Sequence, residues 1–203
     1  MQPQAIVFDI GNVLLRWEPR LALGRILPDA AAIDAFMAEI DFPAWNLAQD
    51  AGRSWDDGVA AVAATQPRHA ATAAAFRAGW HDAVPGEVPG ARAILDALAA
   101  AGLPLYAITN FSAEKWAESV ARFPFLASAF RDVVVSAHER LTKPDPRIFR
   151  LFLDRNGLDA GACVFIDDSA ANVAAARAIG MDAIRFTDAP ALAAALRERG
   201  LPG

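Results

Sequence analysis

The sequence predicts an α/β fold with a parallel sheet and a helical bundle inserted after the first strand. From residue 90 onward, short apolar runs alternate with helical stretches, which is typical of βαβ units with right-handed crossovers. Another apolar run stands near the N-terminus, at residues 5–9, and residues 16–88 show helical periodicity without β-branched runs. A chain of 203 residues is long enough for one substantial core and such an insert.

The apolar runs are the predicted strands, at residues 5–9, 103–108, 133–135, 163–166 and 183–186. Their short length and continuous hydrophobicity favour strands that are buried on both faces of a sheet. The helices predicted between them lie near residues 90–101, 113–122, 146–156, 170–179 and 189–199.

The insert is predicted to contain helices near residues 19–27, 29–40, 54–66 and 68–83. Asp29 and Ser54 are the expected N-caps, and Asp57 follows Ser54 at the spacing of a capping interaction. The Pro- and Gly-rich stretch 84–90 marks the return to the core. We therefore expect a core of residues 1–15 and 86–203, covered by a cap of residues 16–85.

Polar residues follow four of the predicted strands. They are Asp9, Thr109 with Asn110, Ser136 with Lys143 a short loop later, and Asp167 with Asp168. Because the carboxyl ends of parallel strands lie at one edge of a sheet, we expect these groups to converge. Carboxylates so close together repel one another, and a hard cation such as Mg²⁺ relieves that repulsion. The hydroxyl, amide and ammonium groups suit phosphate oxygens, and an Asp in this setting can attack phosphorus.

These motifs, in this order, resemble those of the haloacid dehalogenase superfamily, most of whose members are phosphatases. The matching stretches read Phe8-Asp9-Ile10-Gly11-Asn12-Val13, Ile108-Thr109-Asn110, Lys143-Pro144-Asp145-Pro146 and Asp167-Asp168-Ser169-Ala170-Ala171-Asn172. The resemblance implies a Rossmann-like three-layer core with a helical cap after the first strand. Within the superfamily, the motif variants that begin at Asp9 (Asp-x-Gly-Asn-Val) and at Asp167 (Asp-Asp-x-x-x-Asn) look closest to those of sugar-phosphate phosphatases. The phosphatase half of bifunctional epoxide hydrolases looks similar too.

The resemblance also implies roles for the residues at the strand ends. Asp9 would be the nucleophile and a ligand of Mg²⁺, with the backbone carbonyl of Gly11 and the carboxylate of Asp168 as further ligands. The expected function is hydrolysis of a small phosphorylated metabolite, such as a sugar phosphate, through an aspartyl-phosphate intermediate.

The phosphoryl group would be held by Thr109, Asn110 and Lys143, and Lys143 also belongs to the implied catalytic set. Asp167 and Asn172 would support these groups from behind. The cap residues expected to face the substrate are Trp17, Phe42, Trp45, Asn46, Gln49 and Asp50, although the tryptophans can equally fill the helical bundle.

Gly11 departs from the family pattern. Phosphatases of the family usually carry an Asp here, which protonates the leaving group and then deprotonates the attacking water. Gly11 keeps the backbone carbonyl but removes the proton-transfer group, a contribution typically worth about 10²–10⁴-fold in rate.

Three interpretations of Gly11 remain open at this point. A phosphatase can favour leaving groups that need little protonation, or take its proton from water or the cap, where His81, Asp50 and Glu39 are candidates. A 2-haloacid dehalogenase uses the same Asp without needing an acid, but such enzymes place Ser-Ser-Asn-like residues where this chain has Asp167-Asp168. The third interpretation is a non-catalytic binding module.

Composition limits the other classes of function. The net charge is −5 and no run of Lys or Arg is present, so no nucleic-acid partner is expected. No run of 18 apolar residues predicts a membrane span, and the N-terminus lacks signal-peptide features, which favours a cytoplasmic protein. The single cysteine, Cys163, lies in an apolar run and is expected to be an inert core thiol. We expect a monomer or a homodimer.

Overall fold

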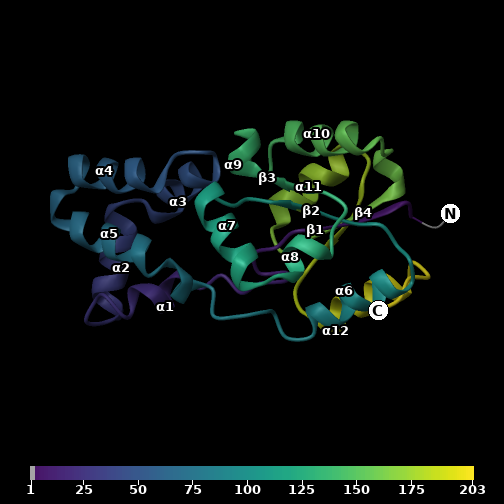
Figure 1. Ribbon diagram of the computed structural model, residues 1–203, viewed down its shortest axis with the longest axis horizontal. Helices are drawn as coiled ribbons and strands as arrows, with labels where there is room; N and C mark the ends of the chain where they lie inside the picture. Colours follow the sequence, from purple (N-terminus) through teal and green to yellow (C-terminus); the bar gives the residue numbers. More distant parts are fainter. Residues whose placement is uncertain (1–2) are drawn as a thin grey trace.

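A five-stranded parallel sheet lies at the centre of the computed structural model, which describes residues 3–203 (Figure 1). Its strands are β1 (Ala5–Phe8), β2 (Leu105–Thr109), β3 (Val133–Val135), β4 (Cys163–Asp167) and β5 (Asp182–Arg185). They lie in the order β3-β2-β1-β4-β5, so the strand order reverses between β1 and β4. In a doubly wound sheet this reversal opens the crevice where ligands bind.

Helices cover both faces of the sheet and confirm the predicted three layers. They are α6 (Ala91–Ala100) and α12 (Ala189–Arg197) on one face, and α10 (Pro146–Asn156) and α11 (Ala170–Ala178) on the other (Figure 1). Alternate residues of β1 pack against the helices on opposite faces of the sheet. Phe8 belongs to the apolar cluster of Leu95 and Leu192, whereas Val7 belongs to that of Phe149 and Val173. The core also contains α7 (Ala113–Arg122), α8 (Phe125–Ser128) and α9 (Ser136–Glu139).

The predicted helical insert follows β1 and forms a separate lobe beyond one end of the sheet (Figure 1). Its helices are α1 (Pro19–Leu23), α2 (Ala30–Glu39), α3 (Phe42–Asp50), α4 (Trp55–Thr65) and α5 (Ala70–Ala78), with short 3₁₀ turns at Pro67–His69 and Trp80–Ala83. Asp29 and Ser54 cap α2 and α4 as predicted, by accepting from the N–H groups of Ala32 and Asp57. No helix within residues 3–203 is both long and apolar enough to cross a membrane.

The sequence pattern does not predict helix α3, because only two residues separate it from α2 and a proline lies in its first turn. Asp41 takes a left-handed backbone (φ 49°), and its carboxylate accepts the N–H of Ala44 at 3.4 Å. Pro43 therefore lies in the first turn of α3, where its missing N–H costs no hydrogen bond. This extra helix packs against α9 of the core.

Two neighbouring segments connect the cap to the core. The N–H of Arg16 donates to the carbonyl of Gly86 at 2.9 Å, and the N–H of Glu18 donates to that of Ala83 at 2.7 Å. The exit from β1 and the return from the cap are thus hydrogen-bonded side by side. The predicted domain limits, residues 16–85 for the cap, stay a prediction.

Side chains at the start of α7 and α9 also bind the cap to the core. The hydroxyl of Ser136 lies 2.5 Å from the carbonyl of Asp50, to which it donates, and it accepts the N–H of Phe111 at 2.9 Å. The indole N–H of Trp55 donates to the hydroxyl of Ser112 at 2.8 Å. Ser136, expected among the polar groups that converge at the strand ends, is instead used in this junction.

We expect Ser136→Ala to lower the free energy of unfolding by about 1–3 kcal/mol, because it leaves buried backbone groups of Phe111 and Asp50 without their partner. Urea denaturation of the full chain measures this. The control is Ser128→Ala, which removes an exposed hydroxyl and should change the free energy by less than about 0.5 kcal/mol. Equal losses in the two variants would contradict the role given to Ser136.

Candidate active site

A cavity of about 370 Å³ lies where the carboxyl edge of the sheet meets the cap. Core residues from the ends of β1, β2 and β4 form one wall, and residues of α3 and the two connecting segments form the other. The titratable residues that line it are Asp9, Arg16, Asp50, Lys143 and Asp168. The remaining polar lining includes Asn12, Asn46, Asn110, Ser169 and Asn172. The groups predicted at three of the strand ends therefore do converge.

Asp9 stands directly after β1. Its N–H donates to the carbonyl of Ile166 at 2.8 Å, which continues the pairing of β1 with β4 by one residue. Both polar contacts of the carboxylate use Oδ1, which accepts the N–H of Ile10 at 2.7 Å and the ammonium of Lys143 at 2.8 Å. Within residues 3–203 no hydrogen-bond donor contacts Oδ2, and 11% of the side chain stays exposed.

The electrostatic setting of Asp9 is unusual for a carboxylate. The pKa of Asp9 is raised to about 7: burial is the largest cause, Lys143 opposes the shift, and the carboxylates of Asp167 and Asp168 add to it. Such a site favours a bound cation, because positive charge near the carboxylates stabilises their ionised forms.

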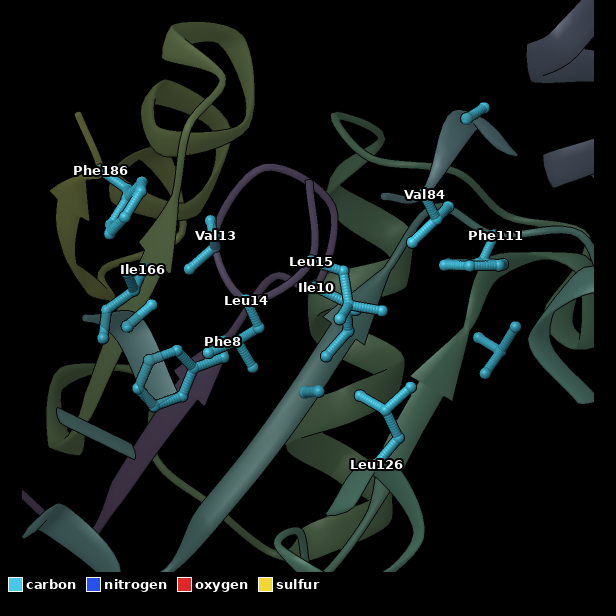
Figure 2. Close-up of a cluster of buried hydrophobic side chains, with 14 of the residues drawn as sticks. Phe8, Ile10, Val13, Leu14, Leu15, Val84, Phe111, Leu126, Ile166 and Phe186 are labelled. Carbon is cyan, nitrogen blue, oxygen red and sulfur yellow. The ribbon is translucent and has the colours of Figure 1, made fainter. Parts of the chain in front are cut away.

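The loop after Asp9 is fixed by apolar packing. Ile10, Val13, Leu14 and Leu15 belong to one buried cluster with Phe8 (Figure 2). The N–H groups of Leu14 and Leu15 both lie 2.9 Å from the carbonyl of Ile10, so the chain turns back tightly on itself. The anchored apolar side chains leave the turn residues 11–12 at the cavity wall.

Asn12 is a site residue that was missing from the predicted set. It takes a left-handed backbone (φ 54°), which Asn tolerates better than most residues. Its side chain accepts the N–H of Trp17 at 3.0 Å and donates to Oδ2 of Asp168 at 3.3 Å. An Asn after a Gly in a turn was the available signal, but its partner Asp168, just after β4, is visible only in three dimensions.

Lys143 lies between two carboxylates at the base of the cavity. Its side chain is fully buried, and Nζ lies 2.8 Å from Asp9 Oδ1 and 2.7 Å from Asp167 Oδ2. Burial alone would lower the pKa of Lys143, but the two carboxylates outweigh it and raise the pKa. Lys143 is therefore a permanent cation in this site.

The side chain of Asn110 fixes the backbone of Lys143. It donates to the carbonyl of Lys143 at 2.9 Å and accepts its N–H at 2.8 Å. Both ends of the Asn110 amide are thus used in positioning Lys143. The role predicted for Asn110 in phosphate binding stays a prediction.

Asp167 and Asp168 are adjacent but differ in their surroundings. Asp167 is fully buried and accepts from Lys143, from the N–H of Ser169 at 2.8 Å and from Asn172 at 3.0 Å. Asp168 is half-buried and lines the cavity, with Asn12 as its side-chain partner. Burial and the charge of Asp167 raise the pKa of Asp168.

These differences decide which carboxylates fit a metal ion. Oxygens of Asp9, Asp167 and Asp168 lie within 4.8 Å of one another, a spacing suited to a cation. The oxygens of Asp167 are already occupied by donors, whereas Asp9 Oδ2 has none and Asp168 has a single weak one. The carboxylates of Asp9 and Asp168 are therefore the ones available to Mg²⁺, which prefers few carboxylates and keeps several waters. The predicted ligand set of Asp9, Asp168 and the carbonyl of Gly11 stays a prediction.

Thr109 ends β2 beside these groups. Its side chain is fully buried, and Oγ1 finds no hydrogen-bond partner among the described residues. Buried hydroxyls are usually paired, so this unpaired hydroxyl is notable beside the site, and the predicted role of Thr109 in phosphate binding stays a prediction. Thr109 does not itself line the cavity wall.

The cap residues predicted to face the substrate divide into two sets. Trp17, Asn46 and Asp50 line the cavity. Phe42, Trp45 and Gln49 are instead buried inside the cap: Phe42 and Trp45 pack against Phe76, and Gln49 Nε2 donates to the carbonyl of Trp45 at 2.7 Å. Trp45 thus fills the helical bundle, which is the alternative that the sequence left open. Periodicity alone did not separate the two faces of α3, because each carries an amide side chain, Gln49 on the buried face and Asn46 on the cavity face.

The three candidate proton donors also separate. Asp50 lines the cavity. Glu39 instead pairs with His69 and Arg68 in the cap. His81 pairs with Glu118 at 2.7 Å. Neither Glu39 nor His81 lines the cavity.

The structure therefore combines a parallel α/β core with a buried lysine and three carboxylates at the carboxyl edge of its sheet, beneath a helical cap. Residues 3–180 match the model of the haloacid dehalogenase-like hydrolases, and the chain belongs to this family. It is 32% identical over 200 residues to the phosphoglycolate phosphatase of Rhodospirillum rubrum. The aligned region covers 90% of this chain and 78% of that protein.

Solved structures confirm the fold. A HAD-like family hydrolase from Porphyromonas gingivalis has a TM-score of 0.76 at 22% identity, covering 97% of this chain and 99% of that one. A HAD family enzyme from Bacteroides thetaiotaomicron, solved as a magnesium complex, has a TM-score of 0.73 at 19% identity, covering 93% and 95%. The magnesium of that structure and the carboxylate cluster of this chain both agree with the predicted cofactor.

We expect Lys143→Met to lower the free energy of unfolding by about 3–5 kcal/mol in the presence of a chelator, because it leaves two buried carboxylates without their cation. Urea denaturation measures the loss. The matched control is Lys115→Met, another buried lysine whose partner, Glu118, is 42% exposed; it should cost about 1 kcal/mol. A similar loss in both variants would contradict a special role for the Lys143 cluster.

Proposed function

We propose that the protein is a Mg²⁺-dependent phosphatase that hydrolyses a small phosphorylated metabolite through an aspartyl-phosphate on Asp9. The observation that carries this proposal is the state of the Asp9 carboxylate. Oδ1 is held by Lys143 and Ile10, while Oδ2 has no donor and belongs to a residue that lines the cavity. A carboxylate fixed by one oxygen and free at the other is prepared for attack.

In the proposed reaction, Oδ2 of Asp9 attacks phosphorus, and the bond between phosphorus and the leaving oxygen breaks. Water then attacks the phosphorus of the aspartyl-phosphate, which releases inorganic phosphate and restores the carboxylate of Asp9. Lys143 and the unpaired hydroxyl of Thr109 supply positive charge and a hydrogen-bond donor for the phosphoryl oxygens. Asp167 keeps Lys143 in place with the help of Asn172.

Asp9, Gly11 and Asp168 are the residues that would hold Mg²⁺. When bound, the ion supplies positive charge that offsets repulsion between the carboxylates and the phosphate. Asn12 orients the Asp168 carboxylate toward this role through its 3.3 Å contact.

The cavity supports a small substrate, and a sugar phosphate is the first class to test. Its volume of about 370 Å³ lies near the lower end of the range for ligand pockets. Trp17 and Trp80, whose ring centroids are 5.3 Å apart, both line it and offer an apolar surface for a sugar ring. The similarity to a phosphoglycolate phosphatase supports a compact phosphate ester.

We expect the protein to release phosphate from p-nitrophenyl phosphate in the presence of Mg²⁺ and to lose this activity with a chelator. Asp9→Asn should abolish it, because the amide is not a nucleophile. Asp182→Asn, at the far end of β5, is the control and should keep full activity. Nitrophenol release measures all three proteins.

Two outcomes would contradict the proposed function. One is undiminished activity in chelator. The other is metal-independent halide release from 2-chloropropionate, which would indicate a haloacid dehalogenase instead.

A second prediction concerns Asp168. We expect Asp168→Asn to raise the half-saturating Mg²⁺ concentration by at least about tenfold, because it removes one of two carboxylates suited to the ion. Calorimetric titration of Mg²⁺ measures this without turnover. Unchanged affinity in Asp168→Asn would assign the ion to other ligands, and Asp182→Asn again serves as the control.

A further inference from the structure

The proposed hydrolysis needs a proton donor that position 11 does not supply. A basic leaving group departs slowly unless its oxygen is protonated as the bond breaks. A Cβ added at Gly11 would meet no heavy atom within 4 Å, so no side chain of the core occupies the space next to this backbone position. Gly11 lines the same cavity as residues of the cap, and a cap residue is therefore the next place to look for the donor.

Four of the five titratable groups on the cavity wall are already engaged. Asp9 and Lys143 form an ion pair at 2.8 Å, and Arg16 pairs with Glu18. Asp168 contacts Asn12 and fits the metal. Among the described residues that line the cavity, Asp50 is the titratable group without a charged partner.

Asp50 is the last residue of α3 and is held by both the cap and the core. Its Oδ2 accepts the side-chain N–H of Asn46 at 3.0 Å, one turn earlier in the helix. Its backbone carbonyl accepts the hydroxyl of Ser136 at 2.5 Å, from the core. The position of Asp50 is thus set by the core that also carries Asp9, although Asp50 belongs to the cap.

The surroundings of Asp50 suit proton transfer near neutral pH. Burial raises the pKa of Asp50 to about 7, and the backbone N–H of Ser112 opposes the shift. A group with such a pKa is present in both protonation states at neutral pH, which is the condition for an efficient general acid and base.

We propose, on the basis of the phosphatase function above, that Asp50 is the acid and base that replaces the missing side chain at position 11. The Asp50 carboxylic acid gives its proton to the leaving oxygen as Asp9 Oδ2 bonds to phosphorus, which releases an alcohol and leaves a carboxylate. That carboxylate then takes a proton from the water that attacks the aspartyl-phosphate. Phosphate is released, and both Asp residues return to their starting states.

The test compares two substrates of similar size, benzyl phosphate and p-nitrophenyl phosphate, whose leaving groups differ greatly in basicity. We expect Asp50→Asn to lower kcat/KM for benzyl phosphate by about 10²–10⁴-fold and for p-nitrophenyl phosphate by less than about tenfold. Adding Gly11→Asp to the Asp50→Asn variant should restore at least about tenfold on benzyl phosphate, since the space at Gly11 accepts a side chain. Glu39→Gln, a cap carboxylate away from the cavity, is the matched control and should leave both substrates unaffected.

The pH profile of the unmodified protein gives a second measurement that needs no variant. Since the proton donor must be protonated, kcat/KM for benzyl phosphate should fall about tenfold per pH unit above about 7, and that for p-nitrophenyl phosphate should fall much less. Asn46 and the N–H of Ser112 face the carboxyl of Asp50, and the charged groups of the same cavity are Asp9, Arg16, Lys143 and Asp168.

Three results would overturn the proposal while leaving the phosphatase function intact. They are equal losses on the two substrates in Asp50→Asn, no loss on either, or matching alkaline limbs in the two pH profiles. If the unmodified protein hydrolyses neither phosphate with Mg²⁺, the phosphatase function itself fails, and the role of Asp50 fails with it.

Discussion

The buried ammonium of Lys143 is the constraint on which the rest of the site depends. Asp9 and Asp167 come from adjacent strands, and their carboxylates could not share a buried space without a cation between them. The ammonium therefore fixes Oδ1 of Asp9 and leaves Oδ2 free. The same contact explains why the two neighbouring carboxylates at the end of β4 differ, since Asp167 binds Lys143 while Asp168, the next residue, faces the cavity.

The sheet topology makes this arrangement possible. The reversal of strand order places the ends of β1 and β4 next to each other, and Lys143 reaches them from the loop before α10. The apolar side chains after Asp9 anchor the first loop, so that its polar turn lies at the cavity wall (Figure 2). Apolar packing thus positions the carboxylate of Asp9, while the ion pairs set its electrostatics.

The fold and most of the core groups could be predicted from the sequence, because strands buried on both faces and polar strand ends leave local patterns. The pairing of Asp167 with Lys143, the contact of Asn12 with Asp168 and the position of Ser136 could not, because they join residues far apart in the chain. The cap was harder still. Phe42 and Asn46 lie one turn apart on the same helix, yet the first fills the bundle and the second lines the cavity.

Moving the proton donor from the loop after β1 to the cap changes what controls catalysis. An acid at position 11 would belong to the core. Asp50 instead belongs to α3, and the hydroxyl of Ser136 and the N–H of Ser112 hold it at the cavity. In the proposed mechanism the proton donor therefore comes from the lobe that also covers the cavity and shields the reacting groups from water. The residues that line the cap side of the cavity then affect both the binding of the substrate and the protonation of its leaving group.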